Sequence, residues 1–118
     1  MARFEAGAIV IVDWHGGARP KEPGRLRPAI VVEDDELFDP AYPNVVVVPH
    51  TNGDRLAIPG LSVTIDPAPD NGCVQRCFAL AASVTSVSVS RVRGTESRVR
   101  PEQLLDIRRR IADVIGLG

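Results

Sequence analysis

Short runs of β-branched and other apolar residues, separated by turn-forming residues, constrain the fold of this chain more than any other feature. Continuous runs occupy 8–12, 29–32 and 45–48. Residues that break regular structure, chiefly Pro, Gly, Asp and Asn, cluster at 14–26, 33–43, 52–60 and 66–72. Because continuous apolar runs of this length are typical of strands covered on both faces, the sequence predicts a closed or folded-over sheet.

Three further segments extend this pattern. Residues 61–65 alternate between apolar and polar, which predicts a strand with one wet face. Residues 78–81 and 84–89 also have the composition of strands. Together with the continuous runs they predict a mainly β protein, a small and strongly bent antiparallel barrel of about six strands.

A helix is predicted at the end of the chain, which makes the fold class α+β. Pro101 suits the first helical position, Glu102 lies near the positive end of the helix, and Gly116 is placed to end it. The arginines at 108–110 are expected to form a solvated face. Apolar residues recur at helical spacing and are expected to pack on the sheet: Leu104, Ile107, Ile111, Val114 and Ile115.

The length and net charge of the chain limit the kinds of protein that it can be. With 118 residues the chain has room for one domain with one real core, spanning 1–118. Its net charge is −1, so bulk charge does not indicate nucleic-acid binding, although arginines gather at 19–27 and 91–110.

No segment approaches the ~20 apolar residues that span a bilayer, and the N-terminus lacks a signal-peptide segment. We therefore expect a cytoplasmic protein with no membrane partner.

Two cysteines, Cys73 and Cys77, lie four residues apart. A disulfide between them is disfavoured in a reducing compartment. A zinc site built on them would need further ligands, and the chain offers only His15 and His50. We therefore expect two reduced, partly buried thiols and no metal.

Arg27 is the first candidate site residue. It follows a Gly- and Pro-broken loop and precedes Pro28, where the run at 29–32 begins. Proline biases the residue before it towards extended backbone. A guanidinium held at such a junction presents a planar donor fork that matches phosphate oxygens. An isolated Arg-Pro pair is also consistent with an ordinary surface arginine at the start of a strand.

His50 and Thr51 form the second candidate. The valine run at 45–48 ends at Pro49, and both residues follow it into a loop that contains Gly53. Strand ends that carry polar groups on a rigid rim are common sites of binding and chemistry. A simple turn is the alternative interpretation.

Taken in order, these features resemble the MazF/PemK toxins, the endoribonuclease half of bacterial toxin–antitoxin pairs. The resemblance implies one toxin domain over 1–118, folded as an SH3-like/CcdB-like barrel with a C-terminal helix. The matching segments are the opening strand at 7–14 (GAIVIVDW), the Arg-Pro signature at 21–32 (KEPGRLRPAIVV), the Pro-x-Thr motif at 47–51 (VVPHT) and the closing helix from 101 (PEQL).

The resemblance implies that Arg27 and Thr51 are catalytic. The family cleaves single-stranded RNA at specific sequences, as mRNA interferases, without a metal ion or other cofactor. The substrate's own 2′-hydroxyl attacks the adjacent phosphate. Arg27 can stabilise the charge that develops on the phosphorane, and the Thr51 hydroxyl is suited to orienting the scissile phosphate.

Further residues near these motifs are expected to contact RNA. Glu22 and His50 are the titratable groups nearest the site in sequence. His50 is a minor hypothesis for proton transfer, whereas Glu22 is expected to pair with Arg25 or Arg27. The expected RNA-binding residues are Glu22, Arg25, Arg19, His50 and Ser83.

The chain departs from the family at one place. Residues 80–83 (LAAS) stand where relatives usually have Leu-x-Asp-Gln, and Ser83 only partly substitutes for the glutamine. Ala82 cannot transfer a proton or contact substrate as an aspartate can. The chain is then either an active toxin that relies on Arg27 and Thr51 or a weakened one that still binds RNA. The intact pair favours activity.

The resemblance also implies partners. The toxins are usually homodimers, and the disordered acidic tail of a cognate antitoxin occupies the RNA groove near the dimer interface. Arg19, Arg25 and Arg27 would line this groove, and the segment 14–26 would form its wall. The runner-up function is a CcdB-like gyrase-binding toxin. Such toxins typically end in an aromatic residue, whereas this chain ends in VIGLG.

Overall fold

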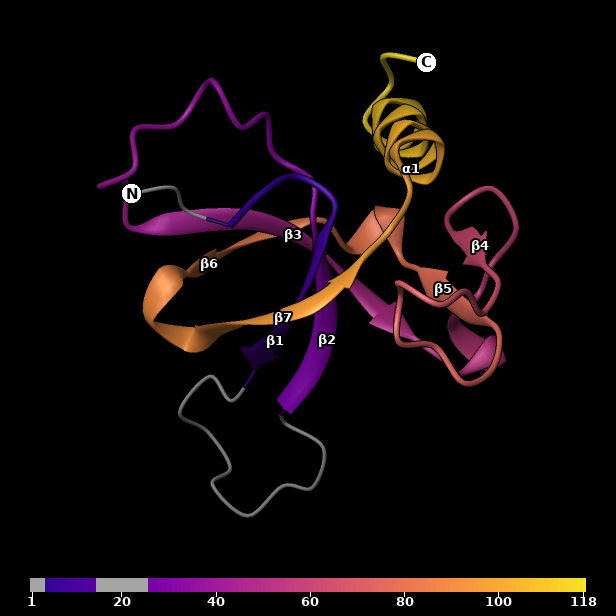
Figure 1. Ribbon diagram of the computed structural model, residues 1–118. Helices are drawn as coiled ribbons and strands as arrows, with labels where there is room; N and C mark the ends of the chain where they lie inside the picture. Colours follow the sequence, from indigo (N-terminus) through magenta and orange to yellow (C-terminus); the bar gives the residue numbers. More distant parts are fainter. Residues whose placement is uncertain (1–3, 15–25) are drawn as a thin grey trace.

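An antiparallel sheet and a C-terminal helix make up the fold. The computed structural model describes residues 4–14 and 26–118 (Figure 1). In these ranges the strands are β1 (Ala8–Asp13), β2 (Leu26–Val31), β3 (Asn44–Thr51), β4 (Val63–Ile65), β5 (Cys77–Ala79), β6 (Thr85–Ser88) and β7 (Val92–Arg98). The helical elements are the short 3-10 turns η1 (Asp54–Leu56), η2 (Ala81–Ser83) and η3 (Val89–Arg91), and the α-helix α1 (Pro101–Val114).

Strand β3 organises the sheet. The strand order is β4-β5-β3-β2-β1-β7, and β6 also pairs with β3. β6 pairs with residues 44–47 of β3 and β5 pairs with 50–51, while β2 occupies the other edge of β3 (Figure 1). Among the described strands no pairing joins β7 back to β4, so the strongly bent sheet is not a closed barrel.

The continuous apolar runs are covered on both faces, as predicted. Alternate residues enter two separate clusters: Ile30 lies in one, whereas Ala29 and Val31 lie in the other. The helix-side core consists of Ile9, Ile30, Val32, Val48, Ile65, Ala79, Val99 and Ile107. The opposite core consists of Val10, Val12, Ala29, Val31, Val45, Val47 and Val92.

The structure has seven strands in its described ranges, one more than predicted. The additional strand, β7, buries only Val92 and includes Gly94, so it lacks the apolar pattern that marks the other strands. Pairing with β1 holds it in place. The strand predicted at 78–81 is also corrected, because β5 ends at Ala79 and the chain then turns through η2.

The helix begins at Pro101, as predicted. The side-chain oxygen of Gln103 accepts a hydrogen bond of 2.8 Å from the backbone N–H of Arg100, just before the helix. Beyond its end, Gly116 adopts a φ of +87°, a conformation that favours glycine. In the described residues no helix combines the length and apolar character needed to cross a bilayer.

The apolar stripe of α1 is only partly buried. Ile107 is fully buried in the helix-side core, and Leu104 and Ile111 pack against that core. The prediction was wrong for Val114 and Ile115, which are 37% and 60% exposed, because the helix continues past the last core contact.

Arg108 also corrects a prediction, since it is not part of a solvated face. Its Nε donates to the carbonyl of Val32 (2.9 Å) and its guanidinium donates to the carbonyl of Glu33 (2.7 Å). Arg109 beside it is exposed, as expected. Arg108 therefore links α1 by hydrogen bonds to the two residues that follow β2.

Replacing Arg108 with methionine is expected to lower the free energy of unfolding by about 2–3 kcal/mol, because it removes two charge-assisted hydrogen bonds and keeps most of the apolar stem. Urea unfolding followed by circular dichroism measures the change. Arg109→Met is the matched control, with an expected change near zero. Equal losses in the two variants would contradict the role given to Arg108.

Candidate functional site

A cavity of about 370 Å³ lies where β2 begins and β3 ends, beside the loop that joins β4 to β5, residues 66–76. Arg27 and Thr51, the two residues predicted to be catalytic, both line it. So does His50. The structure therefore brings the two sequence motifs into one site.

The pairing of β2 with β3 explains why Arg27 and Thr51 line one cavity. In this antiparallel ladder the last pair is Ala29 opposite Pro49. Arg27 and Thr51 lie two residues beyond that pair, at the same end of the two strands. Arg27 is itself paired with Val12 of β1.

Thr51 is held in one orientation by its own turn. Its hydroxyl oxygen accepts a hydrogen bond of 3.0 Å from the backbone N–H of Gly53. This bond uses a lone pair of the oxygen and leaves the hydroxyl proton for donation. The arrangement suits a group that donates a hydrogen bond to an anionic ligand in the cavity.

His50 lies deep in the cavity wall beside both cysteines. It is 6% exposed, its Nε2 lies 3.6 Å from the Sγ of Cys73, and its Nδ1 is buried without a hydrogen-bond partner among the described residues. The ligand atoms of His50, Cys73 and Cys77 all lie within 4.8 Å of one another. Both cysteines are free, Cys73 half-buried and Cys77 buried, which confirms the expected unbonded thiols.

Burial sets the protonation states of this cluster. It lowers the pKa of His50 from 6.5, so the imidazole is neutral at neutral pH. Burial, followed by the hydrogen bond and the charge of Cys77, raises the pKa of Cys73 to about 12. A neutral, buried imidazole does not offer a positive charge to RNA phosphates. His50 therefore acts as a neutral part of the cavity wall.

Acidification is expected to destabilise the protein through His50. Below its unfolded pKa of about 6.5, the unfolded chain binds a proton that the buried imidazole does not. Stability should fall by up to about 1 kcal/mol as the pH drops from about 6.5 to about 5.5. Urea unfolding at both pH values should show this loss in the wild type and a smaller one in His50→Gln. Equal losses in both proteins would contradict it.

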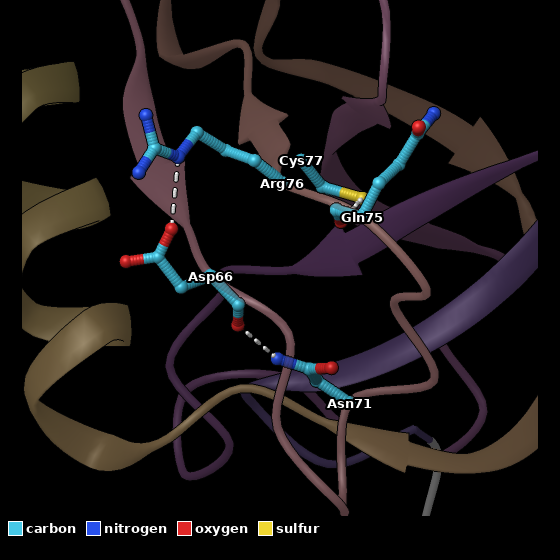
Figure 2. A network of polar contacts seen from close by, with 5 residues as sticks. All are labelled: Asp66, Asn71, Gln75, Arg76 and Cys77. Carbon is cyan, nitrogen blue, oxygen red and sulfur yellow. Dashed lines mark hydrogen bonds and ion pairs between the residues drawn. The ribbon is translucent and has the colours of Figure 1, made fainter.

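Asn71 shapes the loop that forms the far wall of the cavity. It is 3% exposed and its side chain makes three bonds: Oδ1 accepts from the N–H groups of Ala68 (3.1 Å) and Cys73 (2.9 Å), and Nδ2 donates to the carbonyl of Asp66 (2.9 Å). Figure 2 shows this last bond, together with the ion pair between Arg76 and Asp66.

The backbone conformation after Asn71 favours glycine. Gly72 has a φ of +69°, and a Cβ built there would lie 2.7 Å from the hydroxyl oxygen of Ser97 on β7. The loop therefore packs closely on a strand that the sequence did not reveal, and β7 adds Thr95 and Ser97 to the cavity wall. Asn71, Thr95 and Ser97 were not predicted. The only local signal was the Asp-Asn-Gly turn sequence at 70–72.

Asn71→Ala is expected to lower the free energy of unfolding by about 1–3 kcal/mol, because it removes three part-buried hydrogen bonds to the backbone of Ala68, Cys73 and Asp66. Chemical denaturation measures the loss. Asn52→Ala, at an exposed asparagine, is the control and should be nearly neutral. The organising role of Asn71 is rejected if both variants unfold at the wild-type midpoint.

The other predicted RNA-binding residues lie elsewhere. Ser83 is exposed on η2 and is not among the residues that line the cavity. Ala82 beside it is also exposed, and its backbone N–H donates to the carbonyl of Leu61. Arg19, Glu22 and Arg25 lie outside the described residues, as does most of the predicted wall segment 14–26.

Comparison with known proteins bears on this site. Over residues 5–115 the chain matches the model of a family described as PemK-like, MazF-like toxins of type II toxin–antitoxin systems. The Form-I crystal structure of MazF from Deinococcus radiodurans has a TM-score of 0.75 at 20% sequence identity, and the alignment covers 98% of this chain and 99% of that one.

Two mycobacterial structures are similar as well. The Mycobacterium tuberculosis toxin MazF-mt6 has a TM-score of 0.70 at 18% identity, covering 94% of this chain and 98% of that one. An endoribonuclease from a mycobacterial species, solved in complex with its cognate antitoxin, has a TM-score of 0.71 at 16% identity, covering 96% and 95%. At these identities the likeness shows the fold, which is the bent sheet with a C-terminal helix that the sequence predicted.

Proposed function

Because the chain belongs to the PemK-like, MazF-like toxins of type II toxin–antitoxin systems, we propose that it is an endoribonuclease that cleaves single-stranded RNA at a specific sequence. One observation carries the proposal beyond family membership. Arg27 and Thr51 line the same cavity from two paired strands, each two residues beyond the last pair of their ladder.

The proposed reaction needs no metal ion. The 2′-hydroxyl of the nucleotide before the scissile bond loses its proton and attacks phosphorus. The P–O5′ bond then breaks, which leaves a 2′,3′-cyclic phosphate and a 5′-hydroxyl that takes up a proton. Negative charge grows on the non-bridging oxygens in between, and the guanidinium of Arg27 stabilises it with parallel charged donors.

Thr51 orients the phosphate in this scheme. Its oxygen accepts a hydrogen bond from the N–H of Gly53, and its proton remains available to a ligand. A hydroxyl is a weak acid and Arg27 is a poor base at neutral pH, so neither group is assigned a proton transfer.

The difference from the family at residues 80–83 is expected to affect catalysis less than the sequence alone implies. Ala82 and Ser83 are not among the residues that line the cavity, so the exchange of Asp-Gln for Ala-Ser leaves the wall with Arg27 and Thr51 unchanged. This supports an active enzyme over a weakened barrel that only binds RNA. Glu22, Arg25, Arg19, His50 and Ser83 stay proposals as RNA contacts.

A cognate antitoxin and a second copy of the chain are the proposed protein partners. MazE–MazF from Deinococcus radiodurans and the mycobacterial endoribonuclease with its cognate antitoxin are complexes of proteins with a similar fold. An acidic antitoxin segment would compete with RNA for the cavity at Arg27 through charge. RNA protection by added antitoxin would test this competition.

The decisive experiment is cleavage of a long unstructured RNA by purified protein in buffer containing EDTA, with both new ends mapped. We expect cuts at one short sequence, with cyclic phosphate and 5′-hydroxyl ends. RNA that shifts in a gel but stays intact would indicate the weakened barrel. Gyrase-dependent DNA cleavage with intact RNA would indicate the CcdB-like alternative.

A further inference from the structure

We propose that His50, Cys73 and Cys77 bind one zinc ion, or a similar thiophilic divalent ion, in the wall of the cavity. The three residues all line the cavity, so a fourth coordination position is left for water or another oxygen ligand. This proposal does not rest on RNA cleavage, and no step of that reaction is assigned to the ion.

The distances suit a tetrahedral site. With Zn–S near 2.3 Å and Zn–N near 2.05 Å, neighbouring N and S ligands lie about 3.6 Å apart and two S ligands about 3.8 Å apart. The Nε2 of His50 lies 3.6 Å from the Sγ of Cys73, and all three ligand atoms fall within 4.8 Å of one another. Only small side-chain movements would complete the site.

The fold explains how distant residues converge. In the ladder of β3 and β5, His50 lies opposite Ala79. Cys77 lies two residues from Ala79 on the same strand, so its side chain projects from the same face as that of His50. Cys73 comes from the loop, where the side chain of Asn71 holds its backbone N–H at 2.9 Å. Strands β3 and β5, together with the loop that Asn71 holds in place, thus supply the ligands.

The cluster is also short of hydrogen-bond partners. His50 is 6% exposed, its Nδ1 has no partner among residues 4–14 and 26–118, and its Nε2 contacts only a thiol. Apart from each other and His50, the thiols have only backbone carbonyls as partners: the Sγ of Cys77 donates to Gln75 at 3.4 Å (Figure 2) and the Sγ of Cys73 to Asn71 at 3.7 Å. Buried polar side chains normally have better partners. Coordination of a metal ion would give Nε2 a stronger partner than a thiol and would leave the ring proton on Nδ1.

The charges of the three ligands favour a divalent ion in this buried cluster. Binding releases the two thiol protons to solvent, and two thiolates with a neutral imidazole balance the charge of Zn²⁺. The site therefore carries no net charge, which limits the cost of burying it. Two sulfurs and one nitrogen select zinc and related soft ions over Mg²⁺ or Ca²⁺, which prefer oxygen ligands.

Cobalt(II) is the probe for the first experiment. Full-length protein is stripped of metal, kept reduced with a phosphine and titrated with Co²⁺. We expect one ion per chain, a thiolate-to-cobalt charge-transfer band in the near ultraviolet, strong visible bands of a tetrahedral site, and loss of both when Zn²⁺ is added. The double variant Cys73→Ser, Cys77→Ser should lose the charge-transfer band, and His50→Gln should weaken binding. His15→Gln, at the other histidine, should bind as the wild type does.

A second experiment needs no variant, so it does not depend on how the substitutions fold. The wild type is alkylated with N-ethylmaleimide with and without Zn²⁺, with Mg²⁺ as a control, and both thiols are followed by mass spectrometry. Zn²⁺ alone should protect Cys73 and Cys77. Absent cobalt bands, bands that persist in the double variant, or equal alkylation in all conditions would overturn the proposal. Cleavage of RNA in EDTA is a separate result, so either proposal can fail alone.

Discussion

Replacing Arg27 with alanine is expected to lower the rate of RNA cleavage by about 10²–10³-fold, the usual cost of losing one preorganised donor to a developing anion. Arg27 lies in β2 with Val12 opposite it on β1, and it lines the cavity that Thr51 also lines. Its side chain is exposed, so the substitution should leave the fold intact. Single-turnover cleavage of an unstructured RNA measures the effect, with circular dichroism as the check on folding.

Two controls sharpen this prediction. Arg27→Lys keeps the positive charge and loses the planar donor fork, so its rate should fall between those of the wild type and Arg27→Ala. Arg109→Ala removes an exposed arginine on α1, away from the cavity, and should cleave at the wild-type rate. An Arg27→Ala protein that is folded and cleaves normally would remove Arg27 from the mechanism.

Replacing Thr51 with valine is expected to lower the cleavage rate by about 10–100-fold. Valine has nearly the same shape and lacks the hydroxyl, and a hydrogen bond to a charged group is worth about 1.5–3 kcal/mol. The substitution also removes the acceptor for the N–H of Gly53, which now holds the hydroxyl in position. The rate is measured in the same single-turnover assay.

Thr51→Ser is the matched control, because serine keeps the hydroxyl and its bond to Gly53. It should recover most of the activity lost in Thr51→Val. A gel shift with a non-cleavable RNA separates positioning from binding: we expect similar affinity in both variants. If Thr51→Ser is as slow as Thr51→Val, the methyl group matters and the hydroxyl does not.

Much of the fold could be predicted from local patterns. The valine run at 45–48 and the runs at 8–12 and 29–32 all became strands, and alternate residues of each enter the two cores. β7 could not be predicted in this way, because pairing with β1 stabilises it and only Val92 of its residues is buried. The exposed end of the helix at Val114 was missed because helical spacing does not show where the core ends.

Some residues of the candidate site could likewise be predicted from the sequence, and others could not. Arg27 and Thr51 were found from short motifs, one at the start of a strand and the other at the end of a strand. Their shared cavity depends on the pairing of β2 with β3. Asn71 gave almost no signal, because its importance comes from three hydrogen bonds within a folded loop.

The sequence by itself determined the strands, the start of the helix, the family resemblance and the two residues proposed for catalysis, since all of these depend on neighbours along the chain. Only the tertiary structure decided that His50 lies beside Cys73 and Cys77, and that β7 and a pinned loop complete the cavity. The physical reason is that strand register joins residues far apart in sequence. The pairing of β3 with β5 brings His50 to Cys77 and so supplies the third ligand of the proposed metal site.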